Sequence, residues 1–308
     1  MALPVIDTDA LDIDPLRLVE ALREGHRRGI DGFDRSYLAE PRPEGENGFL
    51  LWPAWRHGEA LGAKLATIFP GNEKQGAGPN IRSLYLLFDG KTGAPLALMT
   101  GEAFTRHKTA ADSALGTDLL ARQDARHLLV LGAGAQVETH VAYLRAVRPS
   151  IDRVTLWNRT AAKADAIAAR ISGGASTEDR AGAVSEADIV TCLTAANEPV
   201  LEGAWLKPGT HVDLVGGFTP AMRECDDAAV LRARVFVDHR GLVMAHNGDI
   251  RDPLERGVIG PDHVRGDLFD LCSGRVAGRT DPAEITLFKN GGGGHLDLMA
   301  ATTFHAMV

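Results

Sequence analysis

The sequence predicts an α/β protein in which a doubly wound parallel sheet is joined to a smaller α+β domain. From residue 126 onward, short apolar strands alternate with helical segments, a pattern typical of parallel sheets wound with right-handed crossovers. Before residue 104, one helical segment precedes several strands, and a turn between two of them indicates antiparallel pairing. A chain of 308 residues is long enough for both domains.

The first part of the chain is expected to hold a helix and a largely antiparallel sheet. Residues 14–29 fit a helix that Asp14 caps and Gly29 follows. A second helix is expected from Phe104 to Arg122. Strands are expected at 48–56, 62–69, 82–88 and 95–101, the last two forming a hairpin around the turn GKTGAP.

The second part reads as a series of strands and helices. The apolar runs that predict strands are HLLVL at 127–131, RVTLWNR at 153–159, ADIVTCLT at 187–194, GTHVDLVGG at 209–217 and RVFVDH at 234–239. Helices are expected from Ala135 to Val147, at 160–171 with Thr160 as the cap, and in the terminal HLDLMAATTFHAM.

Composition excludes several classes of partner. A formal net charge of −8 disfavours nucleic acid and anionic membranes, because both attract basic surfaces. No stretch approaches the ~18 consecutive apolar residues of a membrane span, and the N-terminus lacks the basic start of a signal peptide. Three cysteines lie far apart, which suits reduced thiols, so we expect a cytoplasmic protein without a metal site.

The strongest motif is the glycine turn that ends the strand at 127–131. Gly132 permits a tight turn, and Gly134 lets the backbone approach a pyrophosphate. The helix that then begins near Ala135 and Gln136 offers free N–H groups and the positive end of its dipole to that anion. The third glycine of the dinucleotide fingerprint is replaced by Val137, which affects helix–strand packing rather than phosphate contact. This context predicts a Rossmann-type domain with a nicotinamide dinucleotide.

The end of the next strand indicates which dinucleotide binds. NAD sites place a carboxylate about 20 residues beyond the glycines, whereas this chain has Asn158, Arg159 and Thr160 there, with Lys163 one turn on. Arg159 could pair with a 2′-phosphate through two N–H donors; the alternative is that Arg159 and Lys163 are solvated surface cations. We therefore expect NADPH, with NADH possible, and assign Thr194 at the end of ADIVTCLT to the same site.

Motifs in a specific order relate the chain to a known family. They are WPAW, GAKLATIFPGN, LLFDGKTGAPLALMTG, TRHKTAADSALGTDLLARQDA, LGAGAQ, DLVGGFTP and LFKNGGGGHLDLMAA. Together they resemble the ornithine cyclodeaminase and mu-crystallin family over nearly the whole chain. The resemblance implies a substrate-binding and dimerisation domain at 1–114 with 290–308, a Rossmann domain at 115–289, and a homodimer.

The resemblance also implies a set of cations that hold a substrate carboxylate. The positions map to Arg35, with Arg42 as a rival, to Lys64, and to Lys108, where the family carries Arg. Lys is a point charge and cannot form the planar fork of Arg, so the carboxylate geometry must differ. Considered without the family, Lys64 lies inside the apolar strand GAKLATIF and still needs a partner or ligand, because an unpaired buried charge is costly. The alternative to a substrate-binding role is a structural ion pair for Lys64. For Lys108 the alternative is a cation on the surface of its helix.

The loop after residues 212–215 differs from that of ornithine cyclodeaminases, and this difference narrows the range of expected activities. Ornithine cyclodeaminases carry VGAD there and a Lys four residues later, whereas this chain has Phe218 and Met222. Neither can exchange a proton, but Phe218 could wall a small apolar ring. The versions FTPxMRE and FKNGGGGHLDLM resemble the 1-pyrroline-2-carboxylate reductase branch, which implies reduction of a cyclic ketimine carboxylate to L-proline or L-pipecolate.

Lys64, Lys108 and Thr109 are then the expected catalytic residues, with Thr109 or a bound water as the proton relay. His295, at the start of the final helix, is expected near the substrate, with a simple helix-start role as the alternative. His107 could titrate there or point outward, and Asp297 is expected as a helix N-terminal carboxylate. Three other activities stay open: an ornithine cyclodeaminase, an alanine dehydrogenase, and a non-catalytic NADPH-dependent binder of a small acid.

Overall fold

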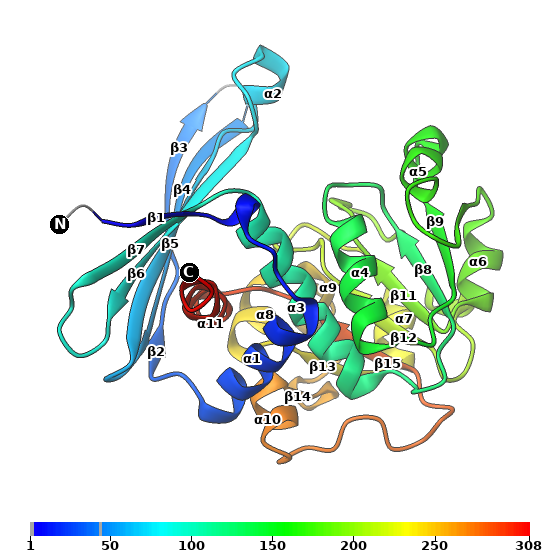
Figure 1. Ribbon diagram of the computed structural model, residues 1–308. Helices are drawn as coiled ribbons and strands as arrows, with labels where there is room; N and C mark the ends of the chain where they lie inside the picture. The colour runs from blue at the N-terminus through cyan, green and yellow to red at the C-terminus, as the bar shows by residue number, and fades with distance from the viewer. Residues whose placement is uncertain (1–2, 43–44) are drawn as a thin grey trace. The chain divides into compact units, whose positions relative to one another are not determined.

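A computed structural model describes residues 3–42 and 45–308 of the chain. The chain separates into two compact units, Met1–Lys108 with Gly293–Val308 and Thr109–Gly292, whereas the boundaries expected from the sequence were 114/115 and 289/290. Helix α3 (Ala103–Leu120) begins in the first unit and ends in the second. Figure 1 shows the elements of both units.

The first unit is built on a seven-stranded sheet with the order β1-β7-β6-β5-β4-β2, in which β3 pairs with β4. Strand β1 runs parallel to β7, and the other pairs are antiparallel, as expected for this part of the chain. The strands are β1 (Val5–Asp7), β2 (Gly32–Phe33), β3 (Ser36–Arg42), β4 (Gly45–Arg56), β5 (Ala60–Ile68), β6 (Ile81–Asp89) and β7 (Pro95–Thr100).

Two helices complete the core of this unit. Helix α1 (Pro15–Arg28) begins as predicted, because the Asp14 side chain accepts a hydrogen bond from the backbone N–H of Leu16. Helix α11 (Gly294–His305) is apolar and buried on most of its surface, and it packs on β4, β5 and β6 and on α1. The short elements are α2 (Asn72–Gln75) and the 3₁₀ turn η1 (Thr8–Ala10).

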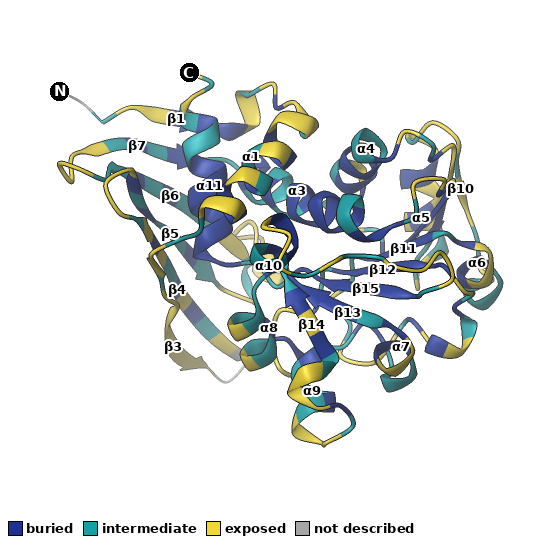
Figure 2. Ribbon diagram, turned by 90° about the horizontal axis from the view of Figure 1, so that it is seen from below, coloured by how far each residue is buried: buried dark blue, intermediate teal, exposed yellow. Residues whose placement is uncertain are grey.

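The second unit contains an eight-stranded, wholly parallel sheet with the order β10-β9-β8-β11-β12-β15-β13-β14. Its central strands are buried along their whole length (Figure 2). The strands are β8 (His127–Leu131), β9 (Arg153–Trp157), β10 (Gly174–Ser176), β11 (Ile189–Cys192), β12 (His211–Leu214), β13 (Arg234–Val237), β14 (Val264–Asp267) and β15 (Thr286–Lys289).

Helices cover both faces of this sheet, so the doubly wound prediction is confirmed. Side chains of α4 and α5 pack on one face of β8 and β9, and those of α6 and α7 pack on the other face of the sheet. The helical elements are α4 (Val137–Val147), α5 (Ala161–Ala168), α6 (Arg180–Glu186), α7 (Asp227–Arg232), α8 (Arg240–His246), α9 (Gly248–Glu255), α10 (Leu268–Cys272), η2 (Gly203–Trp205) and η3 (Pro261–His263).

The chain reverses its direction of travel across the sheet between β8 and β11. It runs from β8 outward to β9 and β10, then returns to β11 on the opposite side of β8. Ligands of such sheets bind at the carboxyl ends of the strands at this reversal. The glycine turn after β8 lies at that point.

Several elements were not predicted. Strand β15 inserts between β12 and β13, strand β3 pairs with the beginning of β4, and the helices α6 to α10 fill the stretches read as connections. These segments are short, and their burial comes from packing rather than from a periodic pattern in their own residues. The prediction for Thr160 was wrong in detail: it stands at the N-cap of α5, but its side chain makes no capping hydrogen bond.

Candidate active site

Lys64 lies in the middle of β5 on the buried face of the first unit's sheet. Trp52 of β4 and Tyr85 of β6 stand directly opposite it in the two neighbouring strands. The Lys64 side chain is only 8% exposed, and its amine lies 5.0 Å from the centre of the Trp52 ring. Such a contact stabilises a cation that has lost its water.

Asp297 brings Lys64 and Lys108 together. Its Oδ1 lies 3.8 Å from Nζ of Lys64 and 3.5 Å from Nζ of Lys108, and its own side chain is fully buried. Lys108 on α3 is 4% exposed, which rules out the surface-cation alternative. Asp297 lies in the first turn of α11, as expected, and there it also serves as the carboxylate shared by two amines.

The glycine run before α11 explains how Asp297 reaches this position. Gly293 has a φ of +159°, which L side chains rarely adopt, and a Cβ on Gly294 would lie 2.8 Å from the carbonyl oxygen of Pro53. Glycine therefore lets the start of α11 approach the backbone of β4. This close approach sets the Asp297 carboxylate beside the Lys64 amine.

Burial controls the electrostatics of the Lys64–Lys108–Asp297 cluster. Loss of solvent lowers the pKa of Lys64 from 10.5 to about 8, against the opposing effect of Asp297 and with a further lowering by Lys108. Burial also raises the pKa of Tyr85, and the Asp297 charge adds to that rise. Two amines face one carboxylate, so the cluster holds an excess of positive charge that an anionic ligand would balance.

The other predicted substrate residues are spread over both units. Arg35 is exposed between β2 and β3, with its guanidinium 5.7 Å from the Tyr37 ring centre, and Phe218 after β12 is 53% exposed. Thr109 is half-buried on α3, and its carbonyl accepts a hydrogen bond from Asn290. Arg42, the rival to Arg35, is exposed at the end of β3 and pairs with Glu40.

Two histidines, His295 and His107, lie in this region and are at least partly buried. His295 is fully buried, edge-on to the His26 ring at 5.8 Å and tilted against Phe33 at 5.2 Å. His107 is half-buried on α3, and its pKa is lowered by burial and by Arg106, with Asp9 opposing. The ring contacts of His295 give it a packing role, and its contact with a substrate stays a prediction.

In the second unit, the loop after β8 has the shape of an anion cradle. The φ of Gly132 is +130°, and a Cβ there would meet the carbonyl oxygen of Leu193 at 2.4 Å, so only glycine fits. A Cβ on Gly134 would meet nothing within 4 Å, so that glycine leaves space for a ligand. Within the described chain, the backbone N–H groups of residues 133–136 donate no hydrogen bond, and α4 has no side-chain cap. These residues fit a dinucleotide pyrophosphate.

The segment after β9 presents free cations. Arg159 and Lys163 are exposed, and neither forms an ion pair with any residue of the described ranges. The Asn158 side chain donates a hydrogen bond to the carbonyl of Thr160, which shapes the turn into α5. No carboxylate follows β9 before Asp165, so a 2′-phosphate would meet no repulsion from this segment.

Sequence reasoning missed a buried charged cluster in the second unit. Lys289 at the end of β15 lies 3.2 Å from Asp249 and 4.0 Å from Glu224, and all three side chains are fully buried. The predicted cofactor residue Thr194 donates hydrogen bonds to Glu224 from its backbone N–H and its hydroxyl. The signal was present, because Lys289 in TLFK is a lysine inside an apolar strand, as Lys64 is.

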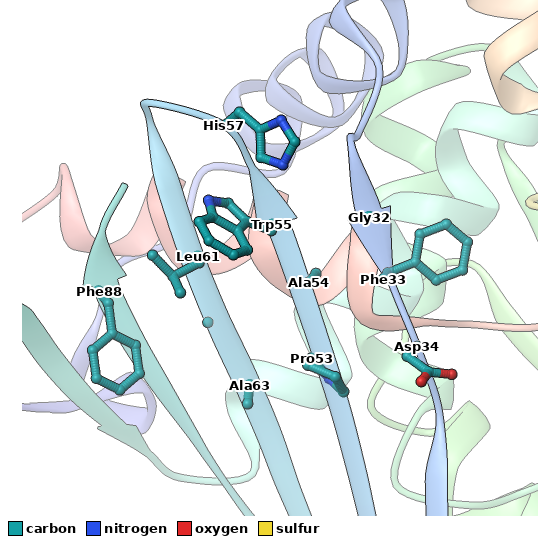
Figure 3. Close-up of a pocket in the computed structure, with 11 residues that line it drawn as sticks. Gly32, Phe33, Asp34, Pro53, Ala54, Trp55, His57, Leu61, Ala63 and Phe88 are labelled. Carbon is teal, nitrogen blue, oxygen red and sulfur yellow. The ribbon is translucent and has the colours of Figure 1, made fainter. Parts of the chain in front are cut away.

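The face of the first sheet away from α11 carries an apolar pocket of 380 Å³. Figure 3 shows Trp55, Leu61 and Phe88 side by side on three adjacent strands of that face. Three of its hydrophobic side chains are unusually open to solvent: Leu38 at 61%, Phe49 at 36% and Trp55 at 46%. Leu38 and Phe49 are directly opposed in β3 and β4, so the apolar surface is continuous across these strands.

Two further properties concern the described residues alone. Across residues 3–42 and 45–308, no helix combines the length and apolar character needed to cross a membrane. Over the same ranges, no cluster of three or more His, Cys, Asp or Glu side chains could hold a metal ion. The three cysteines are buried and form no disulfide there.

Comparison with known proteins agrees with this geometry. The family model described as "Ornithine cyclodeaminase/mu-crystallin family" matches residues 17–307. The Delta(1)-pyrroline-2-carboxylate reductase of Paracoccus denitrificans is 42% identical, covering 92% of this chain and 90% of that protein. The enzyme of the same name from Colwellia psychrerythraea is 36% identical, covering 86% and 85%. The structure of Thermococcus litoralis Delta(1)-pyrroline-2-carboxylate reductase with NADH and L-proline superposes with a TM-score of 0.90 at 29% identity, covering 99% and 97%.

Proposed function

Because the chain belongs to the ornithine cyclodeaminase/mu-crystallin family, we propose that it reduces a cyclic ketimine carboxylate with a nicotinamide dinucleotide. The reaction converts 1-pyrroline-2-carboxylate to L-proline and, with one more ring methylene, 1-piperideine-2-carboxylate to L-pipecolate. The buried Lys64–Lys108–Asp297 cluster carries this proposal, because its excess positive charge suits a small carboxylate. Two relatives named for this reaction, each matched over more than four-fifths of the chain, support it.

Lys64 and Lys108 hold the substrate carboxylate in this proposal. Their side chains are almost fully enclosed, so their attraction for an anion is screened little by water. Lys108 replaces the family's Arg, and it binds as a point charge rather than through a planar fork. Arg35 and Phe218 are proposed to complete the substrate site, Arg35 as a further cation and Phe218 as an apolar wall, with His295 near the ring.

Reduction of the imine also requires one proton at the ring nitrogen. When bound, the dinucleotide supplies the hydride for the ring carbon. With a pKa of about 8, Lys64 can hold or release a proton near neutral pH, which suits it to protonate the imine. Thr109, next to Lys108 on α3, is proposed to relay the proton, and Asp297 balances the charge of the two amines.

The loop after β12 disfavours the cyclodeaminase alternative. Phe218 and Met222 stand where that reaction requires groups that exchange protons or pair with a second amine. The assay follows loss of reduced-nicotinamide absorbance with 1-pyrroline-2-carboxylate, beside ornithine with NAD and beside pyruvate with ammonia. Rapid turnover of the cyclic imine alone is expected. Ammonia release from ornithine would shift the assignment to the lyase, and tight NADPH binding without turnover would shift it to a binding protein.

For the cofactor, we propose a preference for NADPH over NADH. Arg159 and Lys163 are exposed and pair with no residue that the structure describes, so they are available for the 2′-phosphate, as are the turn residues Asn158 and Thr160. Arg159→Ala should raise the KM for NADPH and leave the KM for NADH nearly unchanged, and Arg126→Ala, which lies on the surface and pairs with Asp152, is the matched control. Equal KM values for the two dinucleotides in the native protein would refute the preference.

We also propose a homodimer formed through the apolar face of the first sheet, because that face leaves three large hydrophobic side chains in water. Trp55→Arg puts a charge on that face and should convert the dimer to a monomer in sedimentation velocity. Leu16→Arg, at a 51% exposed site on α1, is the control and should leave the dimer intact. A native protein that sediments as a monomer at micromolar concentration would rule the interface out.

A further inference from the structure

The buried Glu224 joins two loops at the carboxyl edge of the parallel sheet. Its Oε1 accepts hydrogen bonds from the backbone N–H of Thr194, at 2.7 Å, and from the Thr194 hydroxyl, at 2.9 Å. Its Oε2 accepts one from the backbone N–H of Gly216, at 2.7 Å. Thr194 follows β11 and Gly216 follows β12, so one carboxylate ties the ends of two adjacent strands.

The two loops touch each other and the glycine turn. A Cβ on Gly216 would lie 1.7 Å from the carbonyl oxygen of Thr194, so only glycine permits this approach. A Cβ on Gly132 would likewise collide with the carbonyl oxygen of Leu193, at 2.4 Å. The ends of β8, β11 and β12 therefore form one continuous surface, and a displacement of the Glu224 carboxylate would be transmitted to it.

The strand order assigns the two halves of a dinucleotide to opposite sides of β8. In sheets of this type the pyrophosphate binds at the glycine turn after the first strand and the adenosine ribose toward the end of the second, and these strands correspond to β8 and β9 here. Strands β11 and β12 lie on the other side of β8. By this rule the nicotinamide half would bind on the surface formed by the Thr194 and Gly216 loops.

We propose that Glu224 is a positioning residue that holds the Thr194 and Gly216 loops in the arrangement on which the nicotinamide half of the dinucleotide binds. Lys289 and Asp249 hold Glu224 in place: the Lys289 amine lies within 4.0 Å of both carboxylates, and Asp249 accepts hydrogen bonds from the backbone N–H groups of Glu224 and Cys225. The inference rests on the dinucleotide part of the proposed function and not on the identity of the imine.

The groups packed around Glu224 make its charge sensitive to pH. Burial and the neighbouring Asp249 raise the pKa of Glu224 to about 7, although Lys289 and the Thr194 hydrogen bonds oppose the rise. Asp213 on β12, which Ser113 hydrogen-bonds, also has its pKa raised to about 7 by burial. The thiols of Cys192 and Cys225 face the same cluster, with their pKa values raised by burial. Above neutral pH the Glu224 carboxylate is ionised and accepts all three hydrogen bonds strongly. Below neutral pH the carboxyl group becomes protonated, and these three hydrogen bonds weaken.

The test is the dissociation constant of NADH, measured by fluorescence titration between pH 5.5 and 8.5. NADH is the probe because it lacks a 2′-phosphate, which would itself titrate near pH ~6. We expect Glu224→Gln to weaken binding at pH 8 by about tenfold, since one charge-assisted hydrogen bond corresponds to at least that factor. The native Kd should rise as the pH falls through 7, and this rise should be absent from Glu224→Gln. Glu202→Gln, at an exposed glutamate of the same unit, should match the native protein.

Hydrogen exchange of the protein without nucleotide separates positioning from general stability. Glu224→Gln should speed exchange at the Thr194 and Gly216 amides while the β8 amides stay protected. Uniform loss of protection, or native Kd values with the native pH dependence, overturns the proposal. If Glu224→Gln does not fold, a second pair of variants is compared: Thr194→Val removes the hydroxyl hydrogen bond to Glu224, and Thr194→Ser keeps that bond. The Gly216 amide should exchange faster in Thr194→Val than in Thr194→Ser, and equal exchange rates in the two variants would also overturn the proposal. Loss of imine reduction with NADH binding still dependent on Glu224 would refute only the proposed reaction.

Discussion

Replacement of Lys64 by Met should stabilise the fold and abolish catalysis. Met has a similar length without the charge, and Asp297 keeps Lys108 as its partner. The pKa of Lys64 is lowered from 10.5 to about 8, a difference of about 2.5. Each pKa unit is worth about 1.36 kcal/mol, so keeping this amine protonated costs the folded protein about 3 kcal/mol.

The pH dependence follows from which state binds more protons. Below pH 8 both the folded and the unfolded chain hold the Lys64 proton, and the cost is fully present. Between pH 8 and 10.5 the folded protein has released that proton while the unfolded chain keeps it, so native stability rises with pH. The advantage of Lys64→Met should therefore be greatest near pH 7 and should fall by about 3 kcal/mol toward pH 10.

Urea unfolding at pH 7 and pH 10 measures the stability gained by Lys64→Met and its decrease with pH, and turnover of the cyclic imine is assayed on the same samples. Lys91→Met, at an exposed lysine in the β6–β7 turn, provides the control and should shift neither value appreciably. A Lys64→Met protein that is destabilised equally at both pH values would refute the reasoning. It would indicate that Lys64 forms a structural ion pair with Asp297 rather than a binding site held at a cost in stability.

Two further predictions concern the glycine turn after β8 and the Asp297 carboxylate. Gly132→Ala should lower the melting temperature, because its Cβ would collide with the Leu193 carbonyl at a φ of +130°, whereas Gly134→Ala should leave it unchanged and weaken only dinucleotide binding. A loss of stability in both variants would contradict the conclusion that a side chain at Gly134 meets no other atom. Asp297→Asn should destabilise the protein by about 3–5 kcal/mol at neutral pH, because two buried amines lose their shared carboxylate. Urea unfolding checks this value, and the loss should shrink as the pH rises and Lys64 gives up its proton.

The local sequence determined the elements with a strong period or a steric requirement. The apolar run at 127–131 and its glycines predicted β8, the tight turn at Gly132 and the opening at Gly134, because adjacent residues encode a strand and its turn; the close approach of the Leu193 carbonyl to Gly132 depends on a distant strand. A cation inside the apolar strand predicted at 62–69 likewise indicated that Lys64 needs a partner or a ligand, and in β5 its amine lies beside Asp297. The motif order was sufficient to identify the family.

Only the tertiary structure decided which distant residues meet. Asp297 becomes the partner of Lys64 because α11 folds onto β4 and β5, and no local pattern encodes that contact. Strand β15 enters the sheet between β12 and β13, and this brings the Lys289 amine to within 4.0 Å of the Glu224 carboxylate. Short strands and single buried charges have little intrinsic preference, so their position depends on long-range packing and on the cost of leaving a charge unpaired.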